Sequence, residues 1–238
     1  VRALSLAFMV YMGAIVLLPL VLQTQLGYTA TWAGLATAPI GIFPVLLSPL
    51  IGKFGNRLDM RWLVTISFAV YAGCFFWRSE FTAQMSFWDV FWPQFVQGIG
   101  MAMFFMPLTA ITLSRMPAHQ IASASGISNF VRILCGGIGT SIVTTLWERR
   151  SALHHARLTE SITPYADSTT AALNGLQQLG LDAQQQAAAL NRTISQQSSI
   201  IGSNELFWLC GALFLLLIAV VWFAKPPFGG GGGGGGAH

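Results

Sequence analysis

The sequence predicts an all-α membrane protein built from six spanning helices, and two observations lead to this fold class. The first is a set of six apolar runs, at residues 3–22, 32–51, 62–77, 92–113, 122–147 and 206–224. A helix needs about 20 apolar residues to cross a hydrocarbon core about 30 Å thick. The second is charge, since only 8% of the residues are charged, against about 25% in soluble domains. Because backbone polar groups in lipid must be satisfied within the segment, such runs form helices.

Proline marks the first two runs. Run 3–22 contains Pro19, and run 32–51 contains three prolines, of which we expect Pro39 and Pro44 to kink the helix. Proline removes a backbone hydrogen bond and bends the helix that contains it. In membrane helices such breaks are tolerated where a neighbour or a cavity satisfies the backbone.

The third run, 62–77, is short enough to be a buried core helix of a soluble protein. Its flanking Trp62 and Trp77 favour the membrane, because tryptophan gathers where a span meets water. All eight Trp of the chain lie within a few residues of the end of a run. The alternative is tryptophan scattered through a core.

The fourth run, 92–113, carries Pro93 and Pro107 as expected kinks and two amides, Gln94 and Gln97. Amides within a span line a cavity or bond neighbouring helices. A soft stretch of sulfur-containing and aromatic side chains follows, and such surfaces adapt to varied apolar ligands. Met101, Phe104 and Phe105 of this stretch are cavity candidates, as are Tyr11 and Met12 of the first run. Ordinary packing is the alternative for all five.

The fifth run, 122–147, has no proline, and its expected kinks are glycines: Gly136, Gly137 and Gly139. It also holds Arg132, the one ionisable residue deep within a run. A buried charge in a membrane is costly and indicates function, such as holding an anionic partner, tuning a carboxylate or contacting substrate. The alternative is an arginine that bonds the backbone or snorkels. Asn129, one turn earlier, shares its face.

Proline and glycine are thus concentrated in the first, second, fourth and fifth runs, which we expect to line a cavity or to move. The third and sixth runs hold no proline and one glycine each, so we expect them at the periphery. The alternative is that membrane helices simply contain more of both residues than soluble helices do.

A polar insert, residues 148–203, separates the fifth and sixth runs. It contains one helical pattern over 169–179, which Gly180 can cap, and a second from Asp182 to about residue 197. We expect a short helical hairpin that is either a docking surface for a partner or a solvated connector. The chain then divides into four parts: 1–147, 148–203, 204–225 and a flexible Gly-rich tail, 226–238.

Basic residues lie at alternate ends of the runs, and Asp59 is the single acidic residue among them. The basic residues are Arg2, Lys53, Arg57, Arg61, Arg115 and Lys225. Arg78, Glu80 and Asp89 mark the opposite ends. The positive-inside rule then places both termini and the loops 52–61 and 114–121 in the cytoplasm, and the insert on the periplasmic side. Membrane topology accounts for the net charge of +4, so no nucleic-acid partner is indicated.

The sequence shows no nucleophile–base set, metal cluster or phosphate-binding loop, so we expect no catalytic residues, no metal and no cofactor. Cys74, Cys135 and Cys210 lie far apart, each within a run. No Asp or Glu lies deep in a run, and Glu205 is at an edge. Proton coupling needs a titratable group in the pathway, so we expect that group outside this chain.

The tight basic loop 52–61 resembles the Gly-x-x-x-Asp-Arg-x-Gly-Arg-Arg loop of the major facilitator superfamily. Its glycines allow a sharp turn, and its arginines can bond the ends of neighbouring helices, as a cytoplasmic gating loop would. The residues concerned are Gly52, Gly55, Asn56, Arg57, Asp59 and Arg61. Asn56, Asp59 and Met60 depart from the motif, which weakens its charge relay and leaves the turn and the arginines.

Further segments are similar to the fourteen-span drug/proton antiporter family of that superfamily: residues 93–98, 104–109, 128–132, 139–141 and 222–228. The resemblance implies the C-terminal six-span half of a transporter of the bacterial inner membrane, with the first, second, fourth and fifth spans around a central cavity. The start at Val1, without Met, also favours a fragment.

The function that the resemblance implies is proton-coupled efflux of hydrophobic or amphiphilic drugs by alternating access between two halves. The implied partners are membrane lipid, the missing N-terminal half, a periplasmic adaptor protein and an outer-membrane channel. The coupling carboxylate would belong to the missing half. Two alternatives stay open: an exporter of a narrower class, such as fatty acids, bile salts or a metabolite, and a truncated membrane subunit that does not transport.

Overall fold

The computed structural model describes residues 2–47, 60–104, 120–163 and 167–222, and within these ranges the chain is helical, without a strand. The elements are α1 (Arg2–Gln25), α2 (Ala30–Thr37), the 3₁₀ turn η1 (Ala38–Gly41), α4 (Met60–Arg78), α5 (Phe87–Ala102), α7 (Ile121–Ser161), α8 (Asp167–Gln178) and α9 (Ala183–Trp222). Residues 42–47 continue as α-helix after η1.

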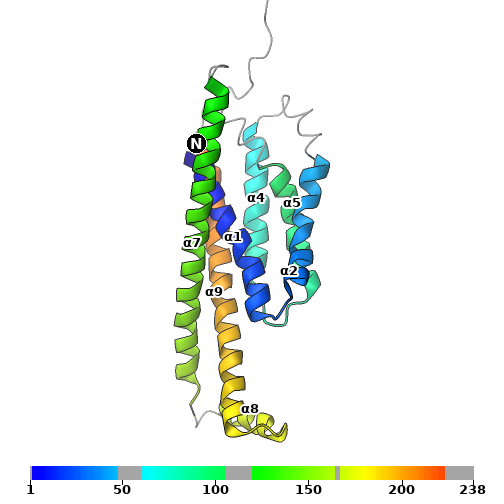
Figure 1. Cartoon of the computed structure of the whole chain (residues 1–238), viewed down its shortest axis with the longest axis vertical. Coiled ribbons are helices and arrows are strands. Elements are labelled where there is room, and N and C mark those ends of the chain that lie inside the picture. The colour runs from blue at the N-terminus through cyan, green and yellow to red at the C-terminus, as the bar shows by residue number, and fades with distance from the viewer. Residues whose placement is uncertain (1, 48–59, 105–119, 164–166, 223–238) are drawn as a thin grey trace, which may run out of the picture.

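Helix α1 lies inside the bundle. It packs against α7 and α9 on one side and against α2 on the other, while α4 packs against both α9 and α5. Figure 1 shows α7 and α9 side by side on one flank of α1. Helices α2, α4 and α5 lie on its other flank. The fold is therefore a helical bundle in which α1 and α9 connect α7 with the helices on the other flank.

Four described stretches are long and apolar enough to cross a membrane: Ser5–Gln25, Ala30–Leu47, Ile121–Glu160 and Ala183–Trp222. They correspond to the first, second, fifth and sixth predicted runs. The third run is α4, a helix of 19 residues. The fourth begins in α5, which ends at Ala102, and the part of this run beyond residue 104 lies outside the described residues.

The second run is not one continuous α-helix. Its first part, α2, begins after Thr29, whose side chain accepts a hydrogen bond from the Trp32 amide at 3.3 Å. It ends at Thr37, and Pro39 lies in the single 3₁₀ turn before the α-helix resumes at residue 42. Proline lacks the amide hydrogen that would continue the α-helical pattern. Pro93, in contrast, lies within α5 without ending it.

The contact between α1 and α7 depends on glycine. A Cβ atom on Gly139 would lie 2.1 Å from the Met9 carbonyl oxygen, and one on Gly13 would lie 2.5 Å from Val143 Cγ2. Lipid tails are as apolar as leucine, so membrane helices associate through close packing, which small residues permit. These two glycines allow the backbones of α1 and α7 to approach each other.

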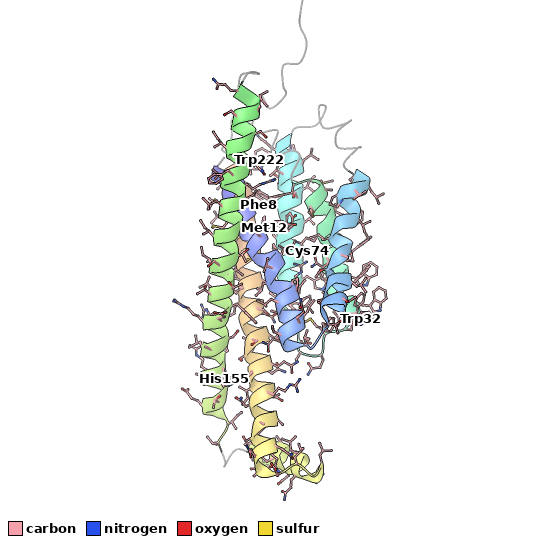
Figure 2. All side chains as sticks on the ribbon, viewed as in Figure 1. Phe8, Met12, Trp32, Cys74, His155 and Trp222 are labelled. Atoms are coloured by element: carbon pink, nitrogen blue, oxygen red, sulfur yellow. The ribbon has the colours of Figure 1, made fainter. Side chains whose placement is uncertain are left out.

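Of the other glycines in this part of α7, one faces α1 and one does not. A Cβ atom on Gly136 would lie 3.0 Å from Phe8 and from Met12, whereas Gly137 faces open space. Figure 2 labels Phe8 and Met12 where α1 crosses α7. Because α7 is assigned as one helix through these positions, a kink there stays a prediction, and Gly136 serves packing.

Aromatic rings fill the interior where α1, α4 and α9 meet. We call these buried residues the aromatic cluster: Tyr11, Phe68, Tyr71, Phe75, Phe104, Phe207 and Phe214. The Tyr71 ring stacks on Phe214, with centroids 5.0 Å apart, and meets the Tyr11 ring edge-on at 5.5 Å. Since the surrounding lipid is also apolar, ring geometry and dispersion stabilise this interior more than removal from water does.

The insert departs from the short hairpin that the sequence predicts. Helix α7 runs for 41 residues, well past residue 147, and α9 runs for 40 residues. The expected second hairpin helix is therefore the beginning of α9 and is continuous with the sixth span. Figure 1 shows both helices extending beyond the bundle, with α8 at their far end. We call residues 148–161, α8 and residues 183–204 the stalk.

Small residues explain why α9 continues without a break. Ser198, Ser199 and Ser203 are buried, and a Cβ atom on Gly202 would lie 3.0 Å from Ser151 Oγ of α7. A close helix–helix contact thus joins the stalk to the bundle where a polar sequence alone suggests a loop. The predicted caps are confirmed: Gly180 has a φ of +79°, and Asp182 Oδ1 accepts from the Gln185 amide at 2.7 Å.

Candidate functional site

Arg78 is the only fully buried charged side chain among the described residues, with 1% of its surface exposed. It is the last residue of α4, and its Nη2 donates to Gln97 Oε1 of α5. Its guanidinium lies 5.4 Å from the Phe75 ring centroid and 6.0 Å from that of Phe207. Aromatic faces attract cations. No described carboxylate pairs with this guanidinium. One amide and two aromatic rings therefore take the place of the water that would hydrate the charge.

The direction of helical side chains explains this burial. Long side chains lean toward the N-terminus of their helix, so an arginine at the C-terminal end of α4 points back into the bundle. From sequence, Arg78 is expected at a water-facing end because it follows the third run. The spacing of Tyr71, Phe75 and Arg78 was the available signal, since residues i, i+4 and i+7 share one helix face.

The two predicted amides, Gln94 and Gln97, are both enclosed, each with 1% of its surface exposed. Gln97 Nε2, Gln94 Oε1 and Arg78 Nε have no hydrogen-bond partner among the described residues. The arrangement is a buried polar group within the half-bundle, and such groups usually bind water or move to find partners. Its role in an open transport cavity stays a prediction.

Three other cavity candidates meet at one place. Tyr11 Oη donates to Met101 Sδ at 3.5 Å, and the Tyr11 ring centroid lies 5.8 Å from that of Phe104. All three belong to the interior of α1, α4 and α5 and not to an exposed groove. Met12 instead faces α7 beside Gly136. Phe105 lies outside the described residues.

Arg132 lies on α7 one helical turn before Gly136 and is partly exposed. Its Nη2 donates to Asn129 Oδ1 at 2.6 Å, so the prediction that the two share a face is confirmed. Its guanidinium lies 5.1 Å from the Phe8 ring centroid of α1. Depth along a span therefore does not mean full burial, since Arg132 lies beside α1 and still keeps part of its surface exposed.

The face of α7 that is turned away from α1 is apolar. Its exposed residues include Ile127, Phe130, Ile133, Leu134, Ile138 and Ile142. The second span exposes a similar set: Leu35, Ile42, Val45 and Leu46. Apolar faces of this extent meet lipid or another protein surface.

A hollow of about 530 Å³ opens where the stalk meets the bundle, between α7, α9 and the segment after α4. We call it the lateral hollow. Its charged residues are Arg150 and Glu205, with Arg150 Nε 3.5 Å from Glu205 Oε2. His154 Nε2 lies 3.0 Å from Glu205 Oε1. From sequence, Glu205 is expected at the edge of a span, and its partners are not predicted. The i, i+4 spacing of Arg150 and His154 is the signal that both face the same way.

The predicted gating loop lies largely outside the described residues, as does Pro107. Gly52, Gly55, Asn56, Arg57 and Asp59 all fall there. Arg61 is described, and its guanidinium lies 6.0 Å from the Trp222 ring. Pro44 lies in the helical residues 42–47. The gating role of the loop stays a prediction.

Several apolar helices of spanning length, packed without strands in the described chain, define a multi-pass helical membrane protein. The family model described as Major Facilitator Superfamily matches residues 1–140. The chain therefore belongs to the major facilitator superfamily, whose EmrB-type relatives are transporters rather than enzymes.

Curated relatives cover nearly all of this chain. The fatty acid resistance protein FarB of Neisseria gonorrhoeae is 59% identical over 214 residues, which are 90% of this chain and 42% of FarB. The multidrug export protein EmrB of Escherichia coli K12 is 56% identical over the same shares. The probable multidrug resistance protein EmrY of that strain is 46% identical over 220 residues. The chain thus spans about 42% of the length of the relatives it matches.

Proposed function

We propose that this chain forms the C-terminal half of an inner-membrane exporter of hydrophobic or amphiphilic compounds, driven by protons and working by alternating access. The observation that carries the proposal is the similarity over 90% of this chain to FarB and EmrB, of which it covers 42%. The second half of such a transporter would supply the other wall of the central pathway.

The pair Arg132 and Asn129 supports this assignment. It lies within the apolar run of α7. A charge within a membrane span is costly and indicates function, and in a transporter of two halves a partner surface can border this position. In the proposed transporter that partner is the N-terminal half, which also contributes the coupling carboxylate, and Arg132 acts on that carboxylate or on substrate.

Dye efflux from everted membrane vesicles under a proton gradient tests the proposal. We expect efflux when this chain is joined to a matching N-terminal half and none from the chain alone. Arg132→Ala in the joined form should reduce the rate at least tenfold. Arg157→Ala, which removes the same charge from an exposed stalk position, should leave it unchanged.

Two results would overturn the proposal. Proton-driven efflux by the chain alone would mean that the coupling group lies within it. Absence of efflux in both forms, with correct insertion, would favour a membrane subunit that does not transport.

The stalk is the part that we propose contacts a periplasmic adaptor protein, which would lead on to an outer-membrane channel. The positive-inside rule places both termini and the loop 52–61 in the cytoplasm, and therefore the stalk in the periplasm. Removing α8 with residues 163–180 should abolish co-purification of the adaptor while the bundle stays helical. Retention of the adaptor by this variant would remove the docking role.

A fatty acid exporter is the second candidate function, because FarB is named for fatty acid resistance and is 59% identical to this chain. Competition separates the two candidates. A multidrug exporter should be inhibited by structurally unrelated amphiphiles in the vesicle assay. A fatty acid exporter should be inhibited by long-chain carboxylates and not by cationic dyes.

A further inference from the structure

The lateral hollow combines opposite charges with an apolar wall. Arg150 and Glu205 line it together with Asn204 and Ser79, and the remaining lining residues are apolar: Leu146, Ile201, Leu206, Trp208 and Leu209. Both side chains are partly exposed, 52% for Arg150 and 40% for Glu205, while the Glu205 Oε2 atom is enclosed and accepts no hydrogen bond from a described residue. A ligand for this hollow therefore needs an apolar body and a polar end that bears charge.

The place of the lateral hollow along the helices shows what surrounds it. The apolar run of α7 ends at Trp147, just before Arg150, and the apolar run of α9 begins at Leu206, just after Glu205. Trp208 is exposed and its ring stacks edge-on with Phe76 at 6.2 Å. Tryptophan at the end of a span marks the level of lipid head groups, so the hollow lies where head groups and the first part of acyl chains meet the protein.

The ion pair within the hollow is loose. Arg150 approaches Glu205 through Nε at 3.5 Å, and no described residue accepts a hydrogen bond from its terminal Nη groups. Exposed pairs of this kind stabilise a protein only weakly, so a ligand can replace or join their contact at little cost. His154 holds the Oε1 side of Glu205 at 3.0 Å, which leaves the Oε2 side toward Arg150.

We propose that the lateral hollow binds the head group of a zwitterionic phospholipid that has a primary ammonium group, as in phosphatidylethanolamine. The phosphate accepts hydrogen bonds from the Nη groups of Arg150, since a guanidinium matches phosphate geometry. The ammonium donates to the Glu205 carboxylate, and an acyl chain lies on Leu206 and Leu209. A single guanidinium beside a single carboxylate matches one anionic and one cationic group. The proposal does not depend on which compound the transporter exports.

Native mass spectrometry of the purified chain in detergent tests the proposal. Phosphatidylethanolamine, phosphatidylcholine and phosphatidylglycerol with identical acyl chains are added separately at equal concentration. We expect at least fivefold higher occupancy with phosphatidylethanolamine, because phosphatidylcholine has no N–H donor and phosphatidylglycerol has no cation. Equal occupancy with phosphatidylcholine, or preference for phosphatidylglycerol, would overturn the proposal without any mutation.

Variants locate the bound lipid. Arg150→Gln and Glu205→Gln should each lower phosphatidylethanolamine occupancy to the level of phosphatidylcholine. Arg157→Gln and Glu160→Gln remove the same charges from exposed positions of α7 outside the hollow and should leave occupancy unchanged. Circular dichroism of each variant checks that helicity is retained. Equal loss in Arg157→Gln and Arg150→Gln would show a general charge effect and refute the site.

Discussion

Arg78 and Arg132 carry the same type of side chain in two regions of the bundle that enclose it to different extents. Arg78 is enclosed between α4, α5 and α9 by Gln97 and two aromatic rings. Arg132 lies on α7 beside α1, is partly exposed, and contacts Asn129 and one ring of α1. The difference shows that burial within a helical bundle is set by the helices that enclose a residue and not by its depth along the span. We therefore expect Arg78 to stabilise the fold and Arg132 to act in the proposed function.

The largest expected effect comes from removing the partner of the buried charge. Gln97→Leu leaves the Arg78 guanidinium without its hydrogen-bond acceptor, and an uncompensated buried charge costs about 3–5 kcal/mol of unfolding free energy. Unfolding in a denaturing detergent, followed by circular dichroism, measures this loss. The double variant Arg78→Met with Gln97→Leu should recover at least half of it, because the charge is then absent. A double variant as unstable as the single one would mean that Arg78 is not the group that needs Gln97.

A smaller loss should follow from separating α1 from α7. Gly139→Ala places a methyl group 2.1 Å from the Met9 carbonyl oxygen, and overpacking of this kind costs about 1–3 kcal/mol. Gly137→Ala is the matched control, since it faces open space and alanine favours a helix over glycine by about 1 kcal/mol. The same unfolding assay should therefore show opposite signs at positions only two residues apart. Equal effects at both positions would show that helix propensity and not the contact with α1 decides.

The smallest effect on stability is expected at the partly exposed Arg132. Arg132→Ala should lower the unfolding free energy by about 1 kcal/mol or less, because its ring contact is partly exposed, while it reduces transport in the joined protein. Comparing the unfolding midpoint with the vesicle efflux rate of the same variant checks the separation of roles. A loss of stability as large as that of Gln97→Leu would place Arg132 with Arg78 as a structural residue and end the contrast between the two regions.

Most of the fold could be predicted from composition, because a run of apolar residues in lipid has few alternatives to a helix. The spans and the caps at Gly180 and Asp182 came from such local rules. The continuity of α9 could not, because it depends on serines that are polar by composition yet small enough to pack against α7. From sequence the second hairpin helix is expected to end near residue 197, because the neighbour that buries Ser198 and Ser199 is not known at that stage.

The candidate site was less predictable for a related reason. Arg132 and Asn129 could be paired from their spacing on one helix. The contacts of Arg78 with Gln97 and of Glu205 with His154 join residues on different helices, and one sequence contains no direct record of which helices are neighbours. The helical spacing of Arg78, and that of Arg150 and His154, indicates which face of its helix each residue occupies. Only the packing shows which residues that face contacts.

The continuous α9 also has a mechanical consequence. At 1.5 Å per residue, the part of α9 within the stalk is about 30 Å long and rigidly joined to a helix of the bundle. A tilt of about 10° in the bundle would carry the tip through about 5 Å, by the same helix geometry. The stalk therefore acts as a lever arm, which turns small rotations within the membrane into larger movements at α8.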